Sequence, residues 1–374
     1  MPRPPSPETR RAATARRHWR ELQSRALAAP DPFAAAALYP YAGAHDRAAL
    51  EARLLGHRRD RLIVAAAAFV DPAVLARLAA VDHDTSLQLR LARNPATPAA
   101  ALARLWQRAE SPRLRQLLAR HPHTPRPILA EIAASAADLE TLRALCENSG
   151  VPAEVLATVG DRHIGLLQRL LAVNLATAEA TLLALWRDTG EDALRAQILL
   201  HPHCPQTLLA TSPPSPLQRR GLAQQHRAPP ALLAALAGDP EALVRRAAAA
   251  NPATPSAALR GRGGDADALV RRALAARRDL SPELAARLSD DPDAWVRRAL
   301  ARNAACPVDL LARAATDADP ELRRAAARHP GCPPALLELL SRDAVAWVQA
   351  AVAYRDDLAA PLLRRLARST DVDV

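Results

Sequence analysis

The sequence predicts an all-α protein in which short helices stack into a solenoid. Hydrophobic residues make up 49% of the 374 residues but aromatic residues only 3%, which argues against a β-sandwich, a collagen or a disulfide scaffold. The segment Leu91–Pro98 recurs in similar form at Ala249–Pro255, Leu300–Pro307 and Ala327–Pro333. Internal similarity at a regular period is the signature of a repeat architecture.

Each repeat can be counted from one residue at the centre of this segment, which we call the turn residue. Neighbouring turn residues are 24–27 positions apart, most often 26, and one unit of this length fills residues 57–374. Two short helices per unit cannot bury their apolar faces alone, so the units must stack on their neighbours. The twelve turn residues are Ala67, Asn94, His121, Asn148, Asn174, His201, Gln225, Asn251, Arg277, Asn303, His329 and Arg355.

Two apolar stripes define the helices of each unit. Three residues before the turn residue, the first helix always carries an apolar residue or Ala, and seven before it there is usually another apolar residue. Positions four residues apart share one face of a helix. Eight residues after the turn residue, Leu occurs in eleven of the twelve units, and Leu311 and Leu363 are two of these. A proline four residues after the turn residue starts the second helix in eight units, because proline in the first turn sacrifices no hydrogen bond.

Residues 1–56 precede the array and are predicted to form a basic N-terminal helical cap region. We expect an amphipathic helix at residues 10–27, with Trp19 on its apolar stripe, that folds back as the cap which a solenoid needs. Contact with nucleic acid or with an anionic membrane surface is an alternative, and an organellar targeting segment is another. Glu8 is the only acid among the first twenty residues, whose basic residues are Arg3, Arg10, Arg11, Arg16, Arg17 and Arg20.

The run Asp291–Asn303, followed by Pro307–Arg313, resembles the leucine-rich repeat variant family, whose arrays are HEAT-like. The resemblance covers residues 57–374 and implies a right-handed α-solenoid. In that family the second helix of a unit tends to be a tight 3₁₀ turn, whereas the longer period of this chain favours an α-helical turn. The founding type of the family also carries an N-terminal cysteine cluster for an iron–sulfur centre. Residues 1–57 of this chain contain no cysteine, so no cofactor is expected.

Cysteines do not indicate a metal or cluster site. Cys204, Cys306 and Cys332 occupy the repeat position that Thr97 fills elsewhere, and no two cysteines have CxxC spacing. A position that holds either Thr or Cys is most simply a small residue buried in a turn. We therefore predict buried turn residues here, with a metal or cluster site as the alternative.

Histidines recur at the turn residue and admit two interpretations. The His-Pro-His turns that begin at His121 and His201 have the residue types of a metal site. His121, His201 and His329 nevertheless stand where other repeats carry Asn, and the two His-Pro-His turns are three repeats apart, about 25–30 Å if helices pack at 8–10 Å. The pattern therefore favours hydrogen-bonding caps of the turn, and no metal ligand is predicted.

Arginines recur at two adjacent positions of the first helix. Six residues before the turn residue, arginines such as Arg245 and Arg271 follow the acids Glu241 and Asp267 by four positions, so we predict ion pairs within each helix. Five residues before the turn residue, five successive repeats carry an arginine without such an acid. These five residues could hold a phosphate backbone or an acidic protein, or could be a solvated face paired to acids of adjacent repeats. We name them the arginine row, which consists of Arg220, Arg246, Arg272, Arg298 and Arg324.

These patterns predict a non-enzymatic scaffold that binds a protein partner through its concave or arginine-lined surface. No Gly-rich phosphate loop, nucleophile elbow or HExxH motif occurs, so we expect no enzymatic activity and no catalytic residue. Trp295 lies at a helix end and is predicted to pack rather than to bind. The alternative function is that of a nucleic-acid-binding HEAT-like protein, including a DNA glycosylase of the AlkD type, with the arginine row on phosphates.

The expected compartment follows from the cysteines and the hydropathy. No apolar run approaches the roughly 18–20 residues that a membrane span needs, and the first twenty residues have no apolar signal-peptide core. Four cysteines in a chain of 374 residues do not make a disulfide framework. We therefore expect a monomer in the reducing cytoplasm.

Overall fold

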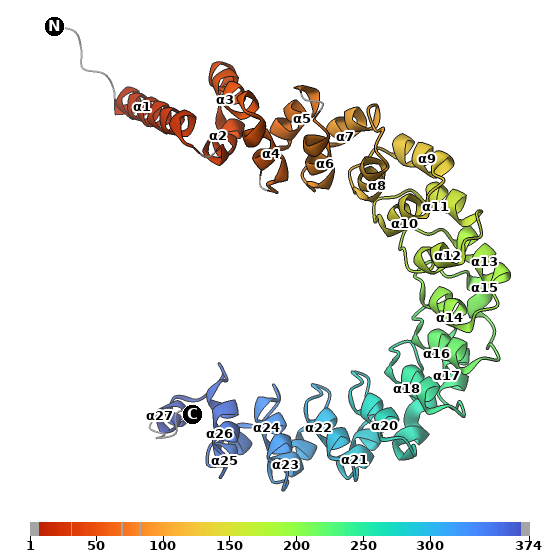
Figure 1. Cartoon of the computed structure of the whole chain (residues 1–374). Helices are drawn as coiled ribbons and strands as arrows, with labels where there is room; N and C mark the ends of the chain where they lie inside the picture. The colour runs from red at the N-terminus through yellow and green to blue at the C-terminus, as the bar shows by residue number, and fades with distance from the viewer. Residues whose placement is uncertain (1–6, 31, 69, 82–83, 368–374) are drawn as a thin grey trace. The chain divides into compact units, whose positions relative to one another are not determined.

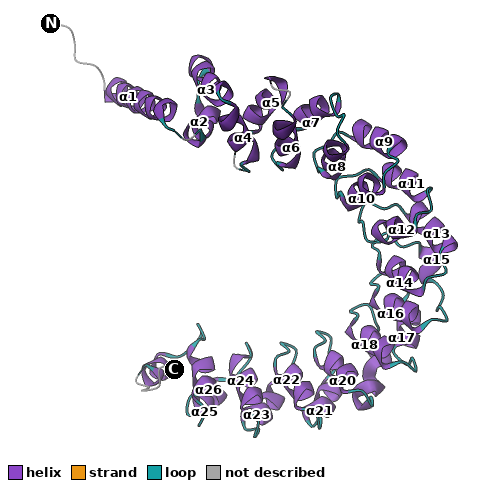
Figure 2. Cartoon of the chain, viewed as in Figure 1, coloured by secondary structure: helices purple, strands orange, loops and turns teal. Residues whose placement is uncertain are grey.

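The structure, a computed structural model, describes residues 7–30, 32–68, 70–81 and 84–367. Within these ranges the chain forms helices and no strands, as Figure 2 shows. It divides into two compact units, Met1–Leu185 and Trp186–Val374, each of which is described by itself. Arg3, one of the six N-terminal arginines, lies outside the described residues.

Unit 1 begins with elements that precede the repeats. The helix expected at residues 10–27 is present as the first of them and contacts the next two helices. Trp19 on this helix donates a hydrogen bond from Nε1 to Asp46 Oδ2 at 2.9 Å. The elements are α1 (Pro7–Ala28), α2 (Phe33–Leu38), the 3₁₀ turn η1 (Tyr39–Tyr41) and α3 (Ala44–Gly56).

The rest of unit 1 alternates between two kinds of helix. The first helix of each sequence repeat, which we call an A-helix, ends next to the turn residue, and the second, a B-helix, follows it. The final B-helix crosses the boundary between the units. The A-helices are α4 (Arg58–Ala66), α6 (Thr85–Arg93), α8 (Pro112–Arg120), α10 (Leu139–Glu147) and α12 (Gly165–Leu171). The B-helices are α5 (Pro72–Val81), α7 (Ala99–Trp106), α9 (Arg126–Ser135), α11 (Ala153–Gly160) and α13 (Glu179–Asp188).

Unit 2 continues the same alternation. Its B-helices are α-helical, as the period predicts, except that α19 is short and passes directly into the 3₁₀ turn η2. The A-helices are α14 (Asp192–Leu200), α16 (Pro216–Gln224), α18 (Ala242–Ala250), α20 (Ala268–Ala275), α22 (Ala294–Ala301), α24 (Pro320–Arg328) and α26 (Ala346–Ala353). The B-helices are α15 (Gln206–Leu209), α17 (Pro230–Leu236), α19 (Ser256–Leu259) with η2 (Arg260–Gly264), α21 (Pro282–Ser289), α23 (Val308–Ala315), α25 (Pro334–Leu340) and α27 (Ala360–Leu366).

Helices of the same kind lie side by side, so each unit has two layers (Figure 1). In unit 2 every A-helix from α14 to α26 contacts the next A-helix, and the B-helices from α17 to α25 form the second layer in the same way. The core lies between the layers. All twelve residues that stand three before a turn residue are buried, which confirms the predicted stripe of the A-helices. Leu363 is an exception to the stripe of the B-helices: it is 48% exposed, and the adjacent Leu362 is buried in its place.

The turn residues connect each repeat to the one before it. Asn251 Nδ2 donates hydrogen bonds to the carbonyl oxygens of Ala223 (2.8 Å) and Gln225 (3.1 Å), and Asn251 Oδ1 accepts from the backbone N–H of Ala253. The first two bonds satisfy carbonyl groups at the end of the preceding A-helix, and the third caps the turn of the residue itself. The predicted capping role is confirmed. The turn residue also makes hydrogen bonds to the preceding repeat, which the spacing of residues along the chain does not reveal. The same bonds to the preceding repeat are made by Asn94, Asn148, Asn174, Gln225, Arg277, Asn303 and Arg355.

Histidine makes the same connection with one fixed tautomer. In His121, Nδ1 accepts the backbone N–H of His123, so the proton of the neutral ring must lie on Nε2, which is 2.9 Å from the carbonyl oxygen of Asn94. A second proton on Nδ1 would face that N–H group. Burial lowers the pKa of His121 below its ordinary 6.5, although the hydrogen bond to Asn94 partly opposes this shift.

This geometry predicts a pH-dependent loss of stability that Asn would remove. Because its folded-state pKa is depressed, His121 stabilises the fold above pH 6.5, and this contribution is lost as the pH falls through the folded-state pKa. We expect the stability of H121N, relative to the unchanged protein, to increase between neutral pH and about pH 5. Urea unfolding at each pH measures the difference, and a difference independent of pH would contradict the prediction.

Four arginines six residues before the turn residue pair with an acid of the following repeat and not with the predicted acid four residues before them: Arg245, Arg271, Arg297 and Arg323. Arg245 instead pairs with Asp265 of the following repeat, with Nε and Nη2 at 2.7 and 2.9 Å from the two carboxylate oxygens. Its Nη1 donates to the carbonyl oxygen of Asp239 at 2.9 Å. Glu241 is the N-cap residue of α18 and has no part in this contact. The equivalent pairs, which we name the interrepeat ion ladder together with this one, are Arg219–Asp239, Arg271–Asp291, Arg297–Asp317 and Arg323–Asp343.

Candidate interaction surface

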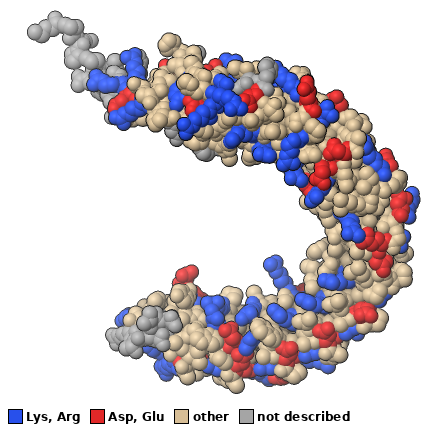
Figure 3. Space-filling model, viewed as in Figure 1, with Lys and Arg blue, Asp and Glu red and all other residues tan. Residues whose placement is uncertain are grey.

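The arginine row runs across five successive A-helices of unit 2. Its members stand on α16, α18, α20, α22 and α24, each five residues before the turn residue. Because residues three and seven before the turn residue point into the core, the intervening arginine position lies on the outer part of the A-layer. Neighbouring helices pack at about 8–10 Å, so the row advances by about this step. Figure 3 shows that basic side chains recur along unit 2, with acidic side chains mainly in a row beside them.

Ion pairing divides the row into two parts. Arg298 places Nε and Nη2 at 2.6 and 2.9 Å from the carboxylate oxygens of Asp319, and only 19% of its side chain is exposed. Arg324 lies 3.5 Å from Glu321 in the same helix. The remaining members are exposed and form no ion pair with any residue that the structure describes; they are Arg220, Arg246 and Arg272.

An apolar row, which the sequence analysis missed, lies beside the arginine row. Leu243 is 53% exposed and stands three residues before Arg246, a spacing that puts the two side chains next to each other on a helix. The apolar residues occupy the same repeat position in four successive A-helices, so a position-by-position comparison of the repeats would have found them. The apolar row consists of Leu217, Leu243, Leu269 and Trp295.

Trp295 packs at the surface against arginine side chains and not in the core. Its side chain is 53% exposed, and guanidinium groups lie on the ring: that of Arg298 is 4.8 Å from the ring centroid and that of Arg272 is 5.6 Å away. These are cation–π distances. The indole therefore ends the apolar row between two members of the arginine row.

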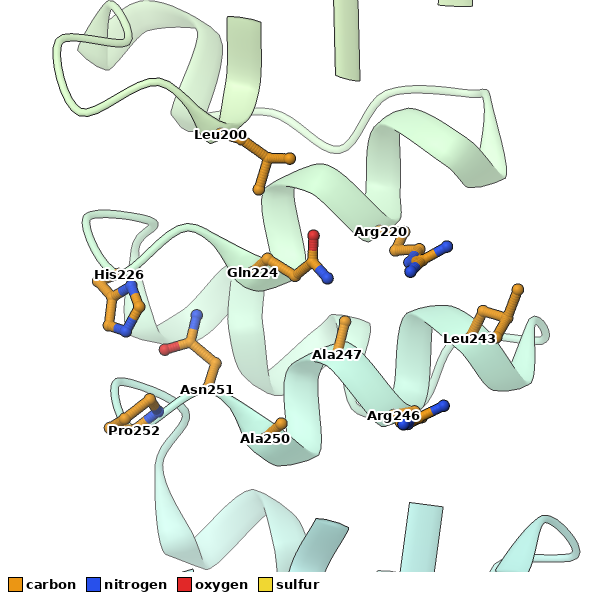
Figure 4. A pocket seen from close by; sticks show the side chains of 10 residues that line it. All are labelled: Leu200, Arg220, Gln224, His226, Leu243, Arg246, Ala247, Ala250, Asn251 and Pro252. Carbon is orange, nitrogen blue, oxygen red and sulfur yellow. The ribbon is translucent and has the colours of Figure 1, made fainter. Parts of the chain in front are cut away.

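A groove of about 520 Å³ opens between α16 and α18 at the unpaired part of the arginine row. Its floor contains the small residues Ala247 and Ala250. Figure 4 shows that Arg220, Arg246 and Leu243 lie at one end of the groove. The groove therefore combines an apolar lining with two guanidinium groups at one end.

Unit 1 offers a different face at the equivalent position. Five residues before the turn residue, α4, α6 and α8 carry Leu62, Leu89 and Gln116 instead of arginine. Arg143 on α10 holds this position but pairs with Glu147 at 2.7 Å. A run of three unpaired arginines on successive A-helices thus belongs to unit 2.

The cysteines are buried, and Cys204, Cys306 and Cys332 lie in turns, as predicted. Burial raises the pKa of Cys306 to about 11 and that of Cys146 to about 12, so these thiols stay protonated at neutral pH. Among the residues that the structure describes, no three His, Cys, Asp or Glu side chains come together as a metal site would require. No helix in the same part of the chain is both long and apolar enough to cross a membrane.

Comparison with known proteins adds no relative to these observations. No protein-family model and no curated protein matches the chain. The resemblance to the leucine-rich repeat variant family therefore stays a prediction, and the arrangement of the arginine row, the apolar row and the groove is what a functional argument can use.

Proposed function

We propose that the chain is a non-enzymatic scaffold of the leucine-rich repeat variant type, a right-handed α-solenoid, which binds a protein partner through the A-layer of unit 2. Support comes from one observation above all: three unpaired arginines alternate with exposed leucines at the same repeat positions of successive A-helices. Contiguous exposed apolar side chains rimmed by polar groups mark interaction sites. A repeat array presents such groups as an extended surface.

The apolar row favours a protein over nucleic acid. A leucine side chain forms no favourable contact with a phosphate backbone, whereas covering one of these half-exposed leucines with a partner is worth about 1 kcal/mol of transfer free energy. Trp295 already holds two guanidinium groups over its ring, so a base would have to compete with them for stacking. The regular step of the arginine row favours the second candidate, a protein that binds duplex DNA through phosphates, and the DNA glycosylase alternative rests on that row alone.

The other parts of the chain have supporting roles in this proposal. Helix α1 packs on α2 and α3, and α3 contacts α4 and α5, so residues 1–56 serve as the cap of the array 57–374. We propose a monomer that works in the cytoplasm without a cofactor. The scaffold holds its partner by contact, and its own residues carry out no reaction.

Removing the three unpaired guanidinium groups should abolish partner capture. The variant replaces Arg220, Arg246 and Arg272 by Ala. The variant and the unchanged protein are each immobilised, and the proteins that each retains from a lysate of cells that express the chain are compared. We expect the unchanged chain to retain proteins that the triple variant does not retain. The replaced side chains are exposed and make no structural ion pair within the described part of the chain, so they are available to a partner. Unfolding curves of the two chains should coincide within about 1 kcal/mol, since the structural contact that the substitutions remove is that between Arg272 and Trp295.

The matched control removes three arginines from the opposite layer. Arg313, Arg342 and Arg364 lie on or just after B-helices and are exposed, so their replacement by Ala changes the net charge equally. Retention that is lost equally in both triple variants would overturn the proposal. A mobility shift of duplex DNA over a salt series is the second arm: DNA binding abolished by the first triple variant and unchanged by L243S would establish the nucleic-acid function instead.

A further inference from the structure

Resting on this proposed function, we infer the chemistry of the partner: an acidic peptide segment in the extended polyproline II conformation. Its carboxylates are three residues apart and meet Arg220, Arg246 and Arg272 in turn. One of its apolar side chains enters the groove between α16 and α18. Each part of this inference follows from a separate feature of unit 2.

The step of the arginine row sets the spacing of the acids. Adjacent A-helices are about 8–10 Å apart, and a polyproline II segment rises by about 3.1 Å per residue with three residues per turn, so residues three apart lie on one face and match one step. An α-helix rises by about 1.5 Å per residue and would need seven residues for the same step. Meeting three arginines takes seven residues of an extended segment but fifteen of a helix. The extended segment therefore orders fewer residues and loses less backbone entropy on binding.

The groove sets the position of the apolar anchor. Gly221 lets α16 approach α14 closely, because a Cβ atom at this position would lie 2.8 Å from the carbonyl oxygen of Ala196. The groove lies along α16 and α18, and Leu200 of α14 also lines it. Ala247 and Ala250 leave about 520 Å³ there, beside Leu243. A single apolar side chain of the partner fits this space. Its burial covers Leu243, which is otherwise 53% exposed.

Polar groups in the groove suit the backbone of an extended segment. A single extended chain leaves its backbone N–H and C=O groups without partners, and burying them unpaired is unfavourable. Gln224 lines the groove and offers both an amide donor and an acceptor, and His226 adds an imidazole at the end opposite to Arg246 (Figure 4). The guanidinium groups then bind the carboxylates, since their planar fork matches that geometry.

Fluorescence anisotropy with synthetic peptides tests the spacing. The first probe repeats Asp-Leu-Ser four times, and the second has the same composition with its four Asp residues consecutive. We expect the full chain to bind the first probe about tenfold more tightly than the second. Equal affinity for the two probes would overturn the inference, and so would tighter binding of a helical peptide with acids seven residues apart.

Two substitutions test separately what the arginine charges and the groove contribute to peptide binding. R246E should weaken the Asp-Leu-Ser probe by about tenfold or more, whereas R313E, on a B-helix, should leave it unchanged. A250W fills the groove from an exposed position, so it should weaken this probe but not an Asp-Ser-Ser repeat. Equal effects of A250W on both probes would refute the anchor.

Failure of this inference can be told apart from failure of the proposed function. If partner capture still depends on the three unpaired arginines but the spacing of the acids has no effect, the scaffold stands and the extended acidic segment is wrong. If neither capture nor peptide binding depends on these arginines, both proposals are wrong. Displacement of the peptide by duplex DNA of higher affinity would replace both with the nucleic-acid function.

Discussion

Replacing Leu311 by Ala should lower the free energy of unfolding by about 2–5 kcal/mol. The side chain is completely buried on α23, in a cluster that joins leucines of both layers of unit 2. The substitution removes three carbon atoms and leaves a cavity, because the neighbouring helices are held by their own contacts and can close it only partly. Urea unfolding followed by circular dichroism measures the loss.

Leu363 provides the matched control within the same repeat position. Both residues stand eight after a turn residue, yet Leu363 is 48% exposed on α27. Because its side chain already contacts solvent, L363A should cost about 1 kcal/mol or less. Equal losses in L311A and L363A would mean that burial by the neighbouring repeat does not stabilise these leucines, which contradicts a stacked array.

The helices and their buried faces could be predicted from the sequence because the interactions that define them are local. Residues three and seven before the turn residue meet on one helical face whatever lies beyond it, and the residues at these positions are buried. Helix starts are equally local. Asp293 caps α22 by accepting the backbone N–H of Trp295, and Asp is one of the residues preferred at a helix N-cap.

Contacts between repeats could not be predicted, because several partners have suitable spacing along the chain. Arg245 has Glu241 four residues before it and Asp265 twenty residues after it. Arg245 pairs with Asp265 because α18 stacks on the following repeat, and the spacing along the chain does not show this. Leu363 shows the same limit, since its exposure depends on what lies over α27 and not on the residues within that helix.

The candidate surface was predicted in part for the same reason. The positions of the arginine row could be predicted from the repeat, but which of its members form ion pairs could not. Arg298 pairs with Asp319, twenty-one residues later, whereas Arg272 has Asp293 at the same spacing and forms no ion pair with it. The apolar row is visible in the sequence only when the residues at one repeat position are compared across successive repeats.

Breaking the interrepeat ion ladder should have the second large effect on stability. Asp265 accepts two hydrogen bonds from Arg245 and one from the backbone N–H of Asp267, and only 4% of its side chain is exposed. D265A removes the carboxylate and leaves the guanidinium group of Arg245 without its partner in a largely buried position. We expect a loss of about 3 kcal/mol in the free energy of unfolding, since removing one partner of a buried pair strands the other charge.

An exposed ion pair gives the comparison that isolates burial. Arg313 and Asp290 are 3.3 Å apart, but 63% and 72% of their side chains are exposed, so D290A should change stability by no more than about 1 kcal/mol. Equal losses in D265A and D290A would mean that the ladder contributes no more than a surface pair.

Protonation of Asp265 should remove its contribution to the free energy of unfolding below about pH 4. The hydrogen bonds from Arg245 hold the pKa of the Asp265 carboxyl below its ordinary 3.8, even though burial opposes this shift. Its contribution is therefore complete above pH 3.8 and is lost as the pH falls through the lower folded-state value. The stability difference between the unchanged protein and D265N should be constant near neutral pH and shrink only below about pH 4. A difference that shrinks already between pH 7 and pH 5 would contradict the prediction, because Asp265 keeps its charge over that range. Histidines such as His121 are present in both chains, so their titration cancels in the difference and the pH at which the difference disappears reports on Asp265 itself.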